Sequence, residues 1–244
     1  MTAIKSKERS ILFSGTMVRA LLDGSKTQTR RALKITPRNS PGCVPYCADN
    51  GKHFRFPVSQ EDFKKLPKSM QQDERSEGAY YYGPCPYGQP GERLWVRETL
   101  YFDKCGEEWC YVAGNDPVMA DPYTAPILLT EGRKFVPSIH MPREASRLLL
   151  EITDVRCERL QDISEADAVA EGIDKFPIEG WEPEYDAGCY KNYLWSPKTA
   201  DKQAKAKTSA EESYESLWAS INGPDSWAAN PWVWVVTFKI ITSG

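Results

Sequence analysis

The segment PWVWVVTFKII (231–241) constrains the fold more than any other part of the chain. Successive residues of a strand point to opposite faces of a sheet, and here apolar side chains occupy both sets of positions. A strand that is apolar on both faces is central in a sheet or is covered on each side. We therefore expect this segment to be a buried strand.

Other segments show the strand pattern more often than the helix pattern. Further strands are predicted at 26–35, 91–102, 107–114 and 145–160. Helices are predicted at 14–24, 59–66, 162–173 and 209–223, with Ser14 or Thr16 and Ser164 as N-caps and Gly24 and Gly172 at the ends. The helices interrupt the strands instead of alternating with them. This order predicts an α+β fold, namely a small, mostly antiparallel β-barrel with peripheral helices.

Three long segments rich in proline, glycine and polar residues separate the predicted elements. They cover about 36–90, 114–142 and 174–207. We interpret 1–244 as a single domain that carries these segments as irregular insertions. Long loops in compact domains usually bind or cover something, and the alternative is a tolerated decoration.

The charge of the chain is unevenly distributed. The net charge is −3, yet residues 1–38 hold nine Lys or Arg against Glu8 and Asp23, so this segment carries +7 and the remainder −10. The small total argues against a general nucleic-acid coat. The asymmetry predicts either a local patch that faces an anion or a set of cations that pair with the acidic remainder.

Seven cysteines, an odd number, favour free thiols over a disulfide framework. The spacing of Cys43, Cys47, His53 and Cys85 lacks the paired pattern of a zinc site, so we predict no metal and no cofactor. No apolar run is long enough to span a bilayer, and the first ten residues have no apolar export core. We therefore expect a cytoplasmic protein without a membrane partner.

The stretch GSKTQTRR (24–31) gathers a turn glycine, a lysine, two threonines and two arginines. Its residues Gly24, Lys26, Thr29 and Arg31 match the G-x-K-x-x-T-x-R signature of the ASCH domain, a branch of the PUA-like β-barrel superfamily, so the chain resembles that family. Three further segments resemble the family in the same order: GERLWVRE, the strand–helix unit that ends at Glu171, and the closing strand. The whole chain is similar to the longer ASCH proteins of phages and prophages, and departs from minimal members by its insertions.

The resemblance implies an activity, because the family includes amidohydrolases that remove the acetyl group from N4-acetylcytidine. The positions that match their proposed catalytic set are Lys26, Thr29 and Glu171. A threonine nucleophile needs a nearby base, and a lysine can serve when burial or neighbouring cations lower its pKa. Glu171 would pass a proton to the leaving amine. In a regular strand Lys26 and Thr29 point to opposite faces, so the turn at Gly24 must bend the chain to bring them together.

Five further residues are predicted to bind the substrate. They are Arg30, Arg31, Trp95, Arg97 and Glu98. An arginine stabilises an oxyanion or lowers the pKa of the lysine, and a tryptophan stacks on a base. Each has an ordinary structural alternative: Trp95 in the core, Arg97 and Glu98 paired with each other, Arg31 in a surface ion pair. Tyr80, Tyr81, Tyr82 and Tyr87 are candidates for an aromatic lid, and Asp225, Trp227 and Asn230 for a loop over the pocket.

Two other functions stay open. PUA-like barrels commonly bind RNA or modified bases, so the chain is alternatively an RNA-binding or base-binding protein. A ribonuclease is a variant of this alternative, although neither His53 nor His140 lies in the signature. The third possibility is a phage accessory protein whose insertions bind partners.

Overall fold

The computed structural model of the chain describes residues 7–34, 45–48, 53–74, 78–103, 108–113, 134–175, 189–194 and 206–241. The helices are α1 (Gly15–Leu22), α2 (Gln60–Lys65), α5 (Glu165–Ala170) and α6 (Ala210–Asn222). The longer strands are β1 (Glu8–Leu12), β2 (Gln28–Ala32), β4 (His53–Pro57), β6 (Gly78–Gly83), β7 (Arg93–Arg97), β11 (Leu149–Arg159) and β14 (Trp232–Ile241). The shorter strands are β3 (Tyr46–Ala48), β5 (Gln71–Glu74), β8 (Leu100–Asp103), β9 (Glu108–Tyr111), β10 (Lys134–Val136), β12 (Tyr190–Lys191) and β13 (Ala206–Lys207). Short 3-10 turns are η1 (Lys68–Met70), η2 (Ser138–His140), η3 (Arg143–Ala145), η4 (Leu160–Asp162) and η7 (Pro224–Ser226).

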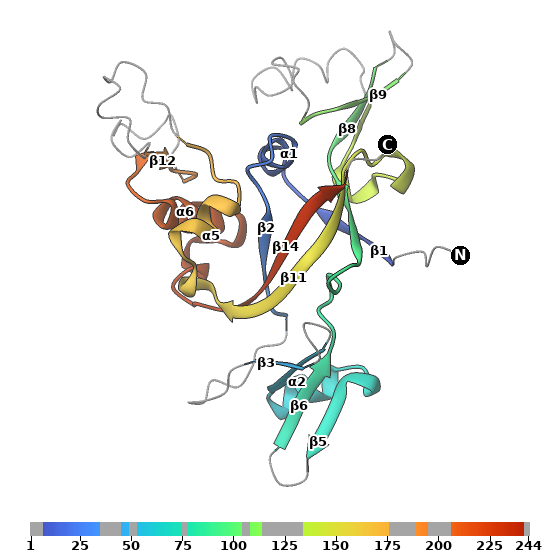
Figure 1. Cartoon of the computed structure of the whole chain (residues 1–244), viewed down its shortest axis with the longest axis vertical. Coiled ribbons are helices and arrows are strands. Elements are labelled where there is room, and N and C mark those ends of the chain that lie inside the picture. The colour runs from blue at the N-terminus through green and yellow to red at the C-terminus, as the bar shows by residue number, and fades with distance from the viewer. Residues whose placement is uncertain are drawn as a thin grey trace.

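A five-stranded sheet with the order β1-β7-β11-β14-β2 forms the centre of the molecule (Figure 1). Its pairs are antiparallel except for the parallel pair β1–β7. In the described part of the chain β1 and β2 are the edge strands, and no pairing between them closes the sheet. The fold is therefore α+β with mostly antiparallel sheets, as the order of elements predicted.

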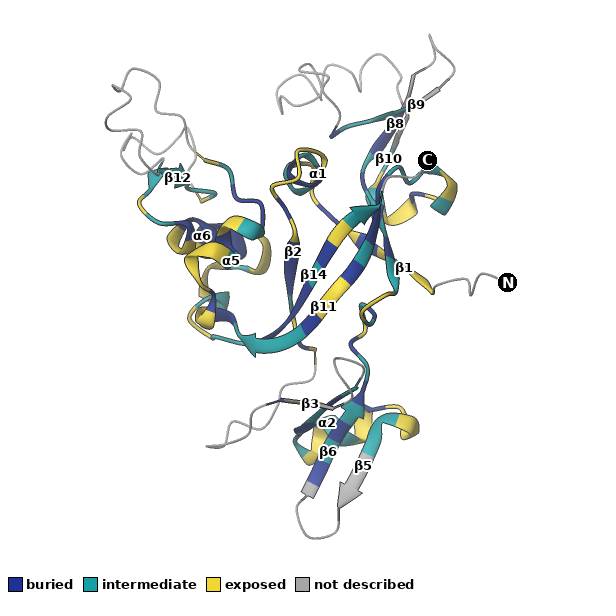
Figure 2. Cartoon of the chain, viewed as in Figure 1, coloured by how far each residue is buried: buried dark blue, intermediate teal, exposed yellow. Residues whose placement is uncertain are grey.

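The closing strand β14 is covered on both faces, which confirms the prediction from its composition. Val233 and Val235 belong to a core cluster formed with α6. Trp234, Val236 and Phe238 belong to the other cluster, on the opposite face. Figure 2 shows this strand and its neighbour β2 largely in the colour of buried residues. Because a hydrophobic cluster covers each face of the strand, neither face is polar.

The part of the first predicted insertion that the structure describes is not irregular. It holds the four-stranded antiparallel sheet β3-β4-β6-β5 together with α2, which we predicted, and η1. The ring of Phe54 packs edge-on against Trp234 of β14, with 4.7 Å between ring centroids. The small sheet thus shares one hydrophobic core with the central sheet. The other two insertions also contain described strands, β10 in one and the pair β12–β13 in the other, while 114–133, 176–188 and 195–205 lie outside the described residues.

The strand β1 was not predicted. It lies parallel to β7, with Ser10 beside Trp95 and Leu12 beside Arg97.

None of the helices in the described part of the chain is long and apolar enough to cross a bilayer.

Candidate functional site

A tight turn between α1 and β2 positions Lys26. Ser14 caps the start of α1, and Gly24 follows its end with φ +80°, a conformation that favours glycine. The Ser25 amide then donates to the Asp23 carboxylate and the Lys26 amide to the carbonyl of Ala20. The chain therefore folds back along α1, and Lys26 enters the interior just before β2 begins.

The end of α5 meets this turn. Ser164 caps the start of α5, and Glu171 lies at its C-cap, so both predicted helix ends are confirmed. The Thr27 amide donates to the carbonyl of Ala170, and Lys26 and Glu171 form an isolated antiparallel bridge. Gly172 has φ +76°, and a Cβ there would lie 2.7 Å from the Cβ atoms of both Ala20 and Lys26. The close approach of the two segments therefore requires glycine at 172.

Lys26 and Glu171 form a buried ion pair. The Lys26 Nζ lies 2.9 Å from Glu171 Oε2 and 2.7 Å from the Glu171 carbonyl oxygen, and both residues are at most 2% exposed. Burial lowers the pKa of Lys26 below its ordinary value; the Glu171 carboxylate opposes this shift, while the charges of Arg31 and Arg30 add to it. A buried lysine with a lowered pKa is able to exchange a proton near neutral pH more readily than a surface lysine.

Arg30 binds the other oxygen of Glu171 and extends the network. Its guanidinium lies 3.2 Å from Glu171 Oε1, 2.6 Å from Glu158 and 2.9 Å from Asp167. Burial alone would lower the pKa of Arg30, but the carboxylates of Glu171 and Glu158 outweigh it and raise the pKa. Arg156 also contacts Asp167, at 2.9 Å. Glu171 is thus held between two buried cations.

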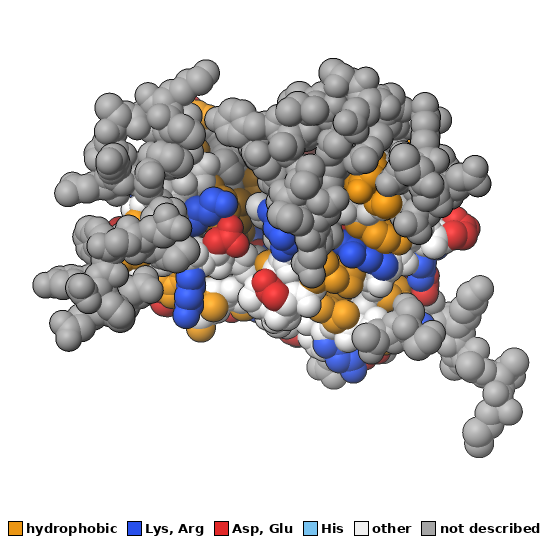
Figure 3. Space-filling view, turned by 90° about the horizontal axis from the view of Figure 1, so that it is seen from above, with side chains coloured by type: hydrophobic (Ala, Val, Ile, Leu, Met, Phe, Trp, Pro, Cys, Tyr) orange, Lys and Arg blue, Asp and Glu red, His pale blue; other side chains and the backbone are white. Residues whose placement is uncertain are grey.

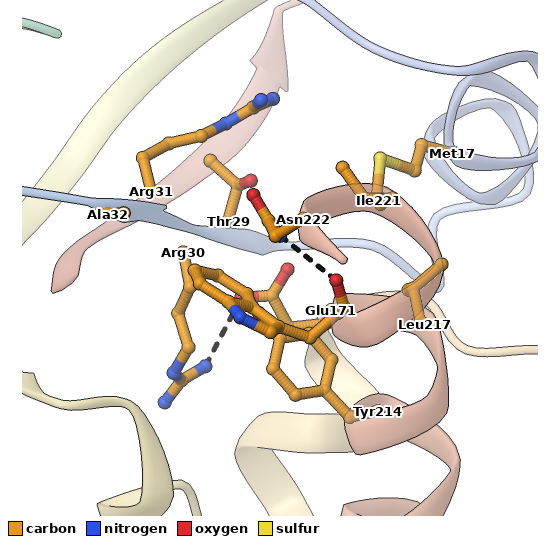
Figure 4. A pocket seen from close by; sticks show the side chains of 11 residues that line it. Met17, Thr29, Arg30, Arg31, Ala32, Glu171, Tyr214, Leu217, Ile221 and Asn222 are labelled. Atoms are coloured by element: carbon orange, nitrogen blue, oxygen red, sulfur yellow. Dashed lines mark hydrogen bonds and ion pairs between the residues drawn. The ribbon is translucent and has the colours of Figure 1, made fainter. Parts of the chain in front are cut away.

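A small cavity of about 70 Å³ opens beside Glu171 at the free edge of β2 (Figure 4). Register with β14 places Arg30 on the face of Val235 and Thr29 and Arg31 on the opposite face. Because β2 is an edge strand, residues of both faces reach the cavity, and Figure 4 shows Thr29 and Arg31 on one side of the strand and Arg30 on the other. The lining comes from α1, β2, α6 and Glu171, and includes Met17, Thr29, Arg30, Arg31, Tyr214, Leu217, Trp218, Ile221 and Asn222.

The cavity is bordered by hydrogen-bond donors without partners. Arg30 Nε, Arg31 Nε and Trp218 Nε1 are buried nitrogens with no hydrogen-bond partner among the residues that the structure describes. Unpaired buried donors are costly, and ordered water, an ion or a bound group commonly supplies the missing acceptor. Thr29 and Tyr214, which carry hydroxyls, also line the cavity. The site therefore presents hydroxyls and unpaired N–H groups to a ligand that carries acceptors.

Lys26 itself does not line this cavity. Its side chain is fully buried behind Glu171, and its Nζ lies 5.5 Å from the centre of the Phe13 ring. Arg31 packs against the same ring. Its guanidinium lies 5.3 Å from the ring centre and donates a hydrogen bond to the Leu12 carbonyl. Lys26 and Thr29 therefore do not meet directly. Glu171 connects them, because it contacts Lys26 and lines the cavity together with Thr29.

The second group of predicted binding residues lies elsewhere. Trp95, Arg97 and Glu98 do not line the cavity beside Glu171. Arg97 stacks on Trp95 at 4.8 Å, and Glu98 is buried and receives two hydrogen bonds of 2.9 Å from Arg147. The pairing of Arg97 with Glu98, one of the structural alternatives, does not occur either. The partner of Glu98 is an arginine 49 residues away, which no local pattern could indicate.

The predicted lid and loop residues also lie away from the cavity. Tyr81 is buried and stacks on Phe56 at 4.7 Å, and His53 stacks on Tyr82 at 5.1 Å. Trp227 packs edge-on against Tyr214, while the side-chain oxygen of Asn230 accepts from the amide of Gln161. These contacts are structural, and Tyr80, Tyr87 and Asp225 do not border the cavity either.

Sequence patterns missed part of the site. Tyr214 and Trp218 lie in the predicted helix 209–223 but were not predicted as site residues, although burial and the Glu171 carboxylate raise the pKa of Tyr214 well above its ordinary value. Glu158 and Asp167 were not predicted at all. The helical spacing of Tyr214 and Trp218 was a usable signal, because residues four apart face the same neighbour.

Metal binding gains no support from the described residues. They contain no group of three or more potential ligands that could hold a metal ion, and Cys43 of the rejected zinc set lies outside them. Burial raises the pKa of Cys85 to about 12, which makes it a poor thiolate ligand.

Three of the nine cations in the basic N-terminal segment are paired with carboxylates from later parts of the chain. Arg9 pairs with Glu92, Lys26 with Glu171 and Arg30 with three carboxylates of the acidic remainder. Of the two explanations of the charge asymmetry, pairing with the acidic remainder therefore accounts for these three cations.

Comparisons of the chain with models of protein families, with curated proteins and with solved structures found no match.

Proposed function

We propose that the protein is an amidohydrolase that removes an acyl group from the exocyclic amine of a modified nucleoside, with N4-acetylcytidine as the reference substrate. The observation that supports this proposal best is the juxtaposition of Thr29 with a buried Lys26–Glu171 pair at a cavity lined by unpaired donors. This combination supplies a nucleophile, a proton acceptor and an oxyanion-binding set, which are the parts that acyl transfer needs.

The proposed reaction begins with attack of the Thr29 hydroxyl oxygen on the amide carbonyl carbon. The threonine proton passes to the Lys26–Glu171 pair, of which Glu171 is the member on the cavity wall. The developing oxyanion accepts hydrogen bonds from Arg31 Nε and Trp218 Nε1, which have no partner in the described part of the chain. The pair then protonates the leaving amine as the C–N bond breaks. Water hydrolyses the resulting Thr29 ester, which releases the carboxylic acid and restores the hydroxyl.

The size of the cavity indicates which part of the substrate enters it. About 70 Å³ accommodates an acyl group and its amide, but not a complete nucleoside. Ile221 and Asn222 line the same cavity and are exposed, with Ile221 57% exposed. We infer that the base and sugar lie at this mouth, against an apolar and an amide side chain. Short acyl groups are then preferred over long ones.

A second candidate is binding of a modified base without hydrolysis. It is favoured by one observation: Lys26 Nζ also donates to the Glu171 carbonyl, so the pair has the contacts of a structural tie between two segments. The unpaired donors would then bind base acceptors. The described side chains visible in Figure 3 include basic and acidic groups interspersed with hydrophobic ones, and these described side chains do not form a continuous basic surface for a nucleic acid.

We also propose the ASCH type of PUA-like fold for the chain. The order of the signature strand, the strand with GERLWVRE, the long strand before Glu171 and the closing strand supports it, and all four lie in one sheet. The described cysteines are free thiols, which suits the proposed cytoplasmic location.

The test is release of acetate from N4-acetylcytidine by the purified protein, measured by separating cytidine from the substrate. We expect turnover by the native chain, a loss of ~10³-fold or more in Thr29→Ala and partial activity in Thr29→Ser. Thr153→Ala, which removes an exposed threonine of β11, is the matched control and should be fully active. No release from N4-acetylcytidine or from related acylated nucleosides, with the fold intact by circular dichroism, would refute the hydrolase and leave the binding function.

A further inference from the structure

A second and larger cavity, of about 540 Å³, lies where the small sheet packs against the central sheet. Leu33, next to the end of β2, and Trp234 of β14 border it from the central sheet, and Phe56 and Tyr81 from the small one. Binding sites for small molecules typically have volumes of ~300–1,000 Å³. Ala32 borders both cavities, so the two adjoin along the same strand.

The lining of this cavity is mostly apolar and includes four aromatic rings. Phe56 and Tyr81 stack with 4.7 Å between centroids and an interplanar angle of 14°, and Trp234 is held edge-on by Phe54. Tyr87, which is partly exposed, adds a fourth aromatic ring to the lining. These rings are fixed by their contacts in the core. Rigid aromatic walls favour a planar ring over a flexible aliphatic chain, because stacking needs no rearrangement.

The rim of the cavity is positively charged. Lys7, Arg9 and Lys34 line it, and none of the described lining residues is acidic. Arg9 is neutralised by Glu92, but Lys7 and Lys34 are exposed and form no ion pair with any described residue. These two lysines belong to the basic N-terminal segment, of which Arg9, Lys26 and Arg30 are paired with carboxylates. The rim therefore complements an anionic group of a ligand.

We propose that this cavity binds a nucleotide, with the base against Trp234, Tyr81 and Tyr87 and the phosphate at Lys7 and Lys34. A free nucleoside monophosphate and a nucleotide within a single strand share this chemistry. The proposal rests on the second cavity alone and does not depend on hydrolysis at Thr29.

The test is isothermal titration of the full chain with CMP, with cytidine and with a short single-stranded oligocytidylate. We expect CMP to bind at least ~10-fold more tightly than cytidine, with an affinity that falls as salt rises. The double variant Lys7→Ala/Lys34→Ala should lose this advantage. Lys64→Ala, which removes an exposed lysine of α2 that does not line the cavity, should bind CMP as the native chain does.

Two further measurements keep the result independent of the first cavity and of folding. Thr29→Ala should bind CMP normally even though it no longer releases acetate, and Tyr87→Leu should weaken CMP with an unchanged melting temperature. Equal affinities for CMP and cytidine, native affinity in the double lysine variant, or no binding at millimolar CMP would each overturn the proposal. A free nucleotide is the ligand if CMP and the oligomer bind alike, and a strand is the ligand if the oligomer binds at least ~10-fold more tightly.

Discussion

Glu171 and Glu98 are carboxylates buried to the same degree, with 2% and 1% of the residue exposed, yet they lie in different surroundings. Glu171 is shared by Lys26 and Arg30 and borders a cavity with unpaired donors. Glu98 is held by both donor groups of Arg147 and does not border that cavity. The difference teaches that burial of a charge does not itself indicate chemistry. What distinguishes Glu171 is its contact with two buried cations together with an adjoining cavity that has space for a reacting group.

The largest expected effect separates the two carboxylates by activity. Glu171→Gln should lower the rate of acetate release by ~10²–10⁴-fold, because the proton acceptor on the cavity wall is lost. Glu98→Gln keeps the volume and should leave the turnover of the folded protein within about threefold of native. Rates are compared at equal concentrations of folded protein. Similar losses of activity in both variants would show that Glu171 and Glu98 do not differ in their role in the reaction.

A second comparison concerns stability. Lys26→Met should lower the free energy of unfolding by roughly 3–5 kcal/mol, because it leaves a buried carboxylate with one cation fewer. Lys65→Met breaks an exposed pair with Glu61 and should lower the free energy of unfolding far less, because solvent screens the pair. Urea unfolding followed by circular dichroism measures both. Equal costs would show that the Lys26–Glu171 pair contributes no more than a surface pair.

The glycine that allows Glu171 to approach Lys26 has no counterpart beside Glu98. Gly172→Ala should destabilise the protein by about 2–3 kcal/mol, because it adds two contacts of 2.7 Å to a strained φ of +76°. Gly24→Ala has a similar φ, +80°, but open space around its Cβ, and should cost only ~1 kcal/mol. The difference between the melting temperatures of the two variants isolates the steric cost of the added Cβ at 172. A Gly172→Ala protein as stable as Gly24→Ala would contradict the close approach.

The smallest effect concerns the outer part of the Glu171 network. Burial opposes ionisation of Asp167, but its hydrogen bond with Gln28 and the charges of Arg30 and Arg156 hold its pKa below the ordinary value. A lowered pKa stabilises the fold above the unfolded value of ~3.9, and this stabilisation is lost as pH falls through the folded pKa. Because Asp167 is partly exposed, the contribution should be less than about 1 kcal/mol.

Urea unfolding between about pH 6 and pH 3 measures this contribution. Asp167→Asn should flatten the fall in stability at the acid end, whereas Asp162→Asn, an exposed control in η4, should leave the curve unchanged. If both variants keep the native pH dependence, Asp167 is not stabilised by the network.

Local patterns predicted the central part of the fold because local rules decide it. The two-faced apolarity of β14 matches the hydrophobic clusters that cover its two faces, and Ser14 and Ser164 cap helices by bonds within three residues. The small sheet β3-β4-β6-β5 was missed because its strands are short and lie among glycines and prolines. They are stabilised by packing against Trp234, which is distant in sequence.

The site was predictable only in part, for the same reason. The signature and the later helix indicated Lys26, Thr29, Arg30, Arg31 and Glu171, which the fold brings to one edge of the sheet. Helical spacing showed that Tyr214 and Trp218 are buried but not that they face a cavity. The group at Trp95, Arg97 and Glu98 was assigned to the wrong place, because the partner of Glu98 comes from a distant segment.

The most direct test of the central claim is the mass of the intact protein after rapid acid quenching of its reaction with N4-acetylcytidine. The account predicts an acetyl ester on the peptide that contains Thr29, absent from Thr29→Ala and formed more slowly in Glu171→Gln. Acetate release at the native rate by Thr29→Ala, or an acetyl group on another residue, would contradict it.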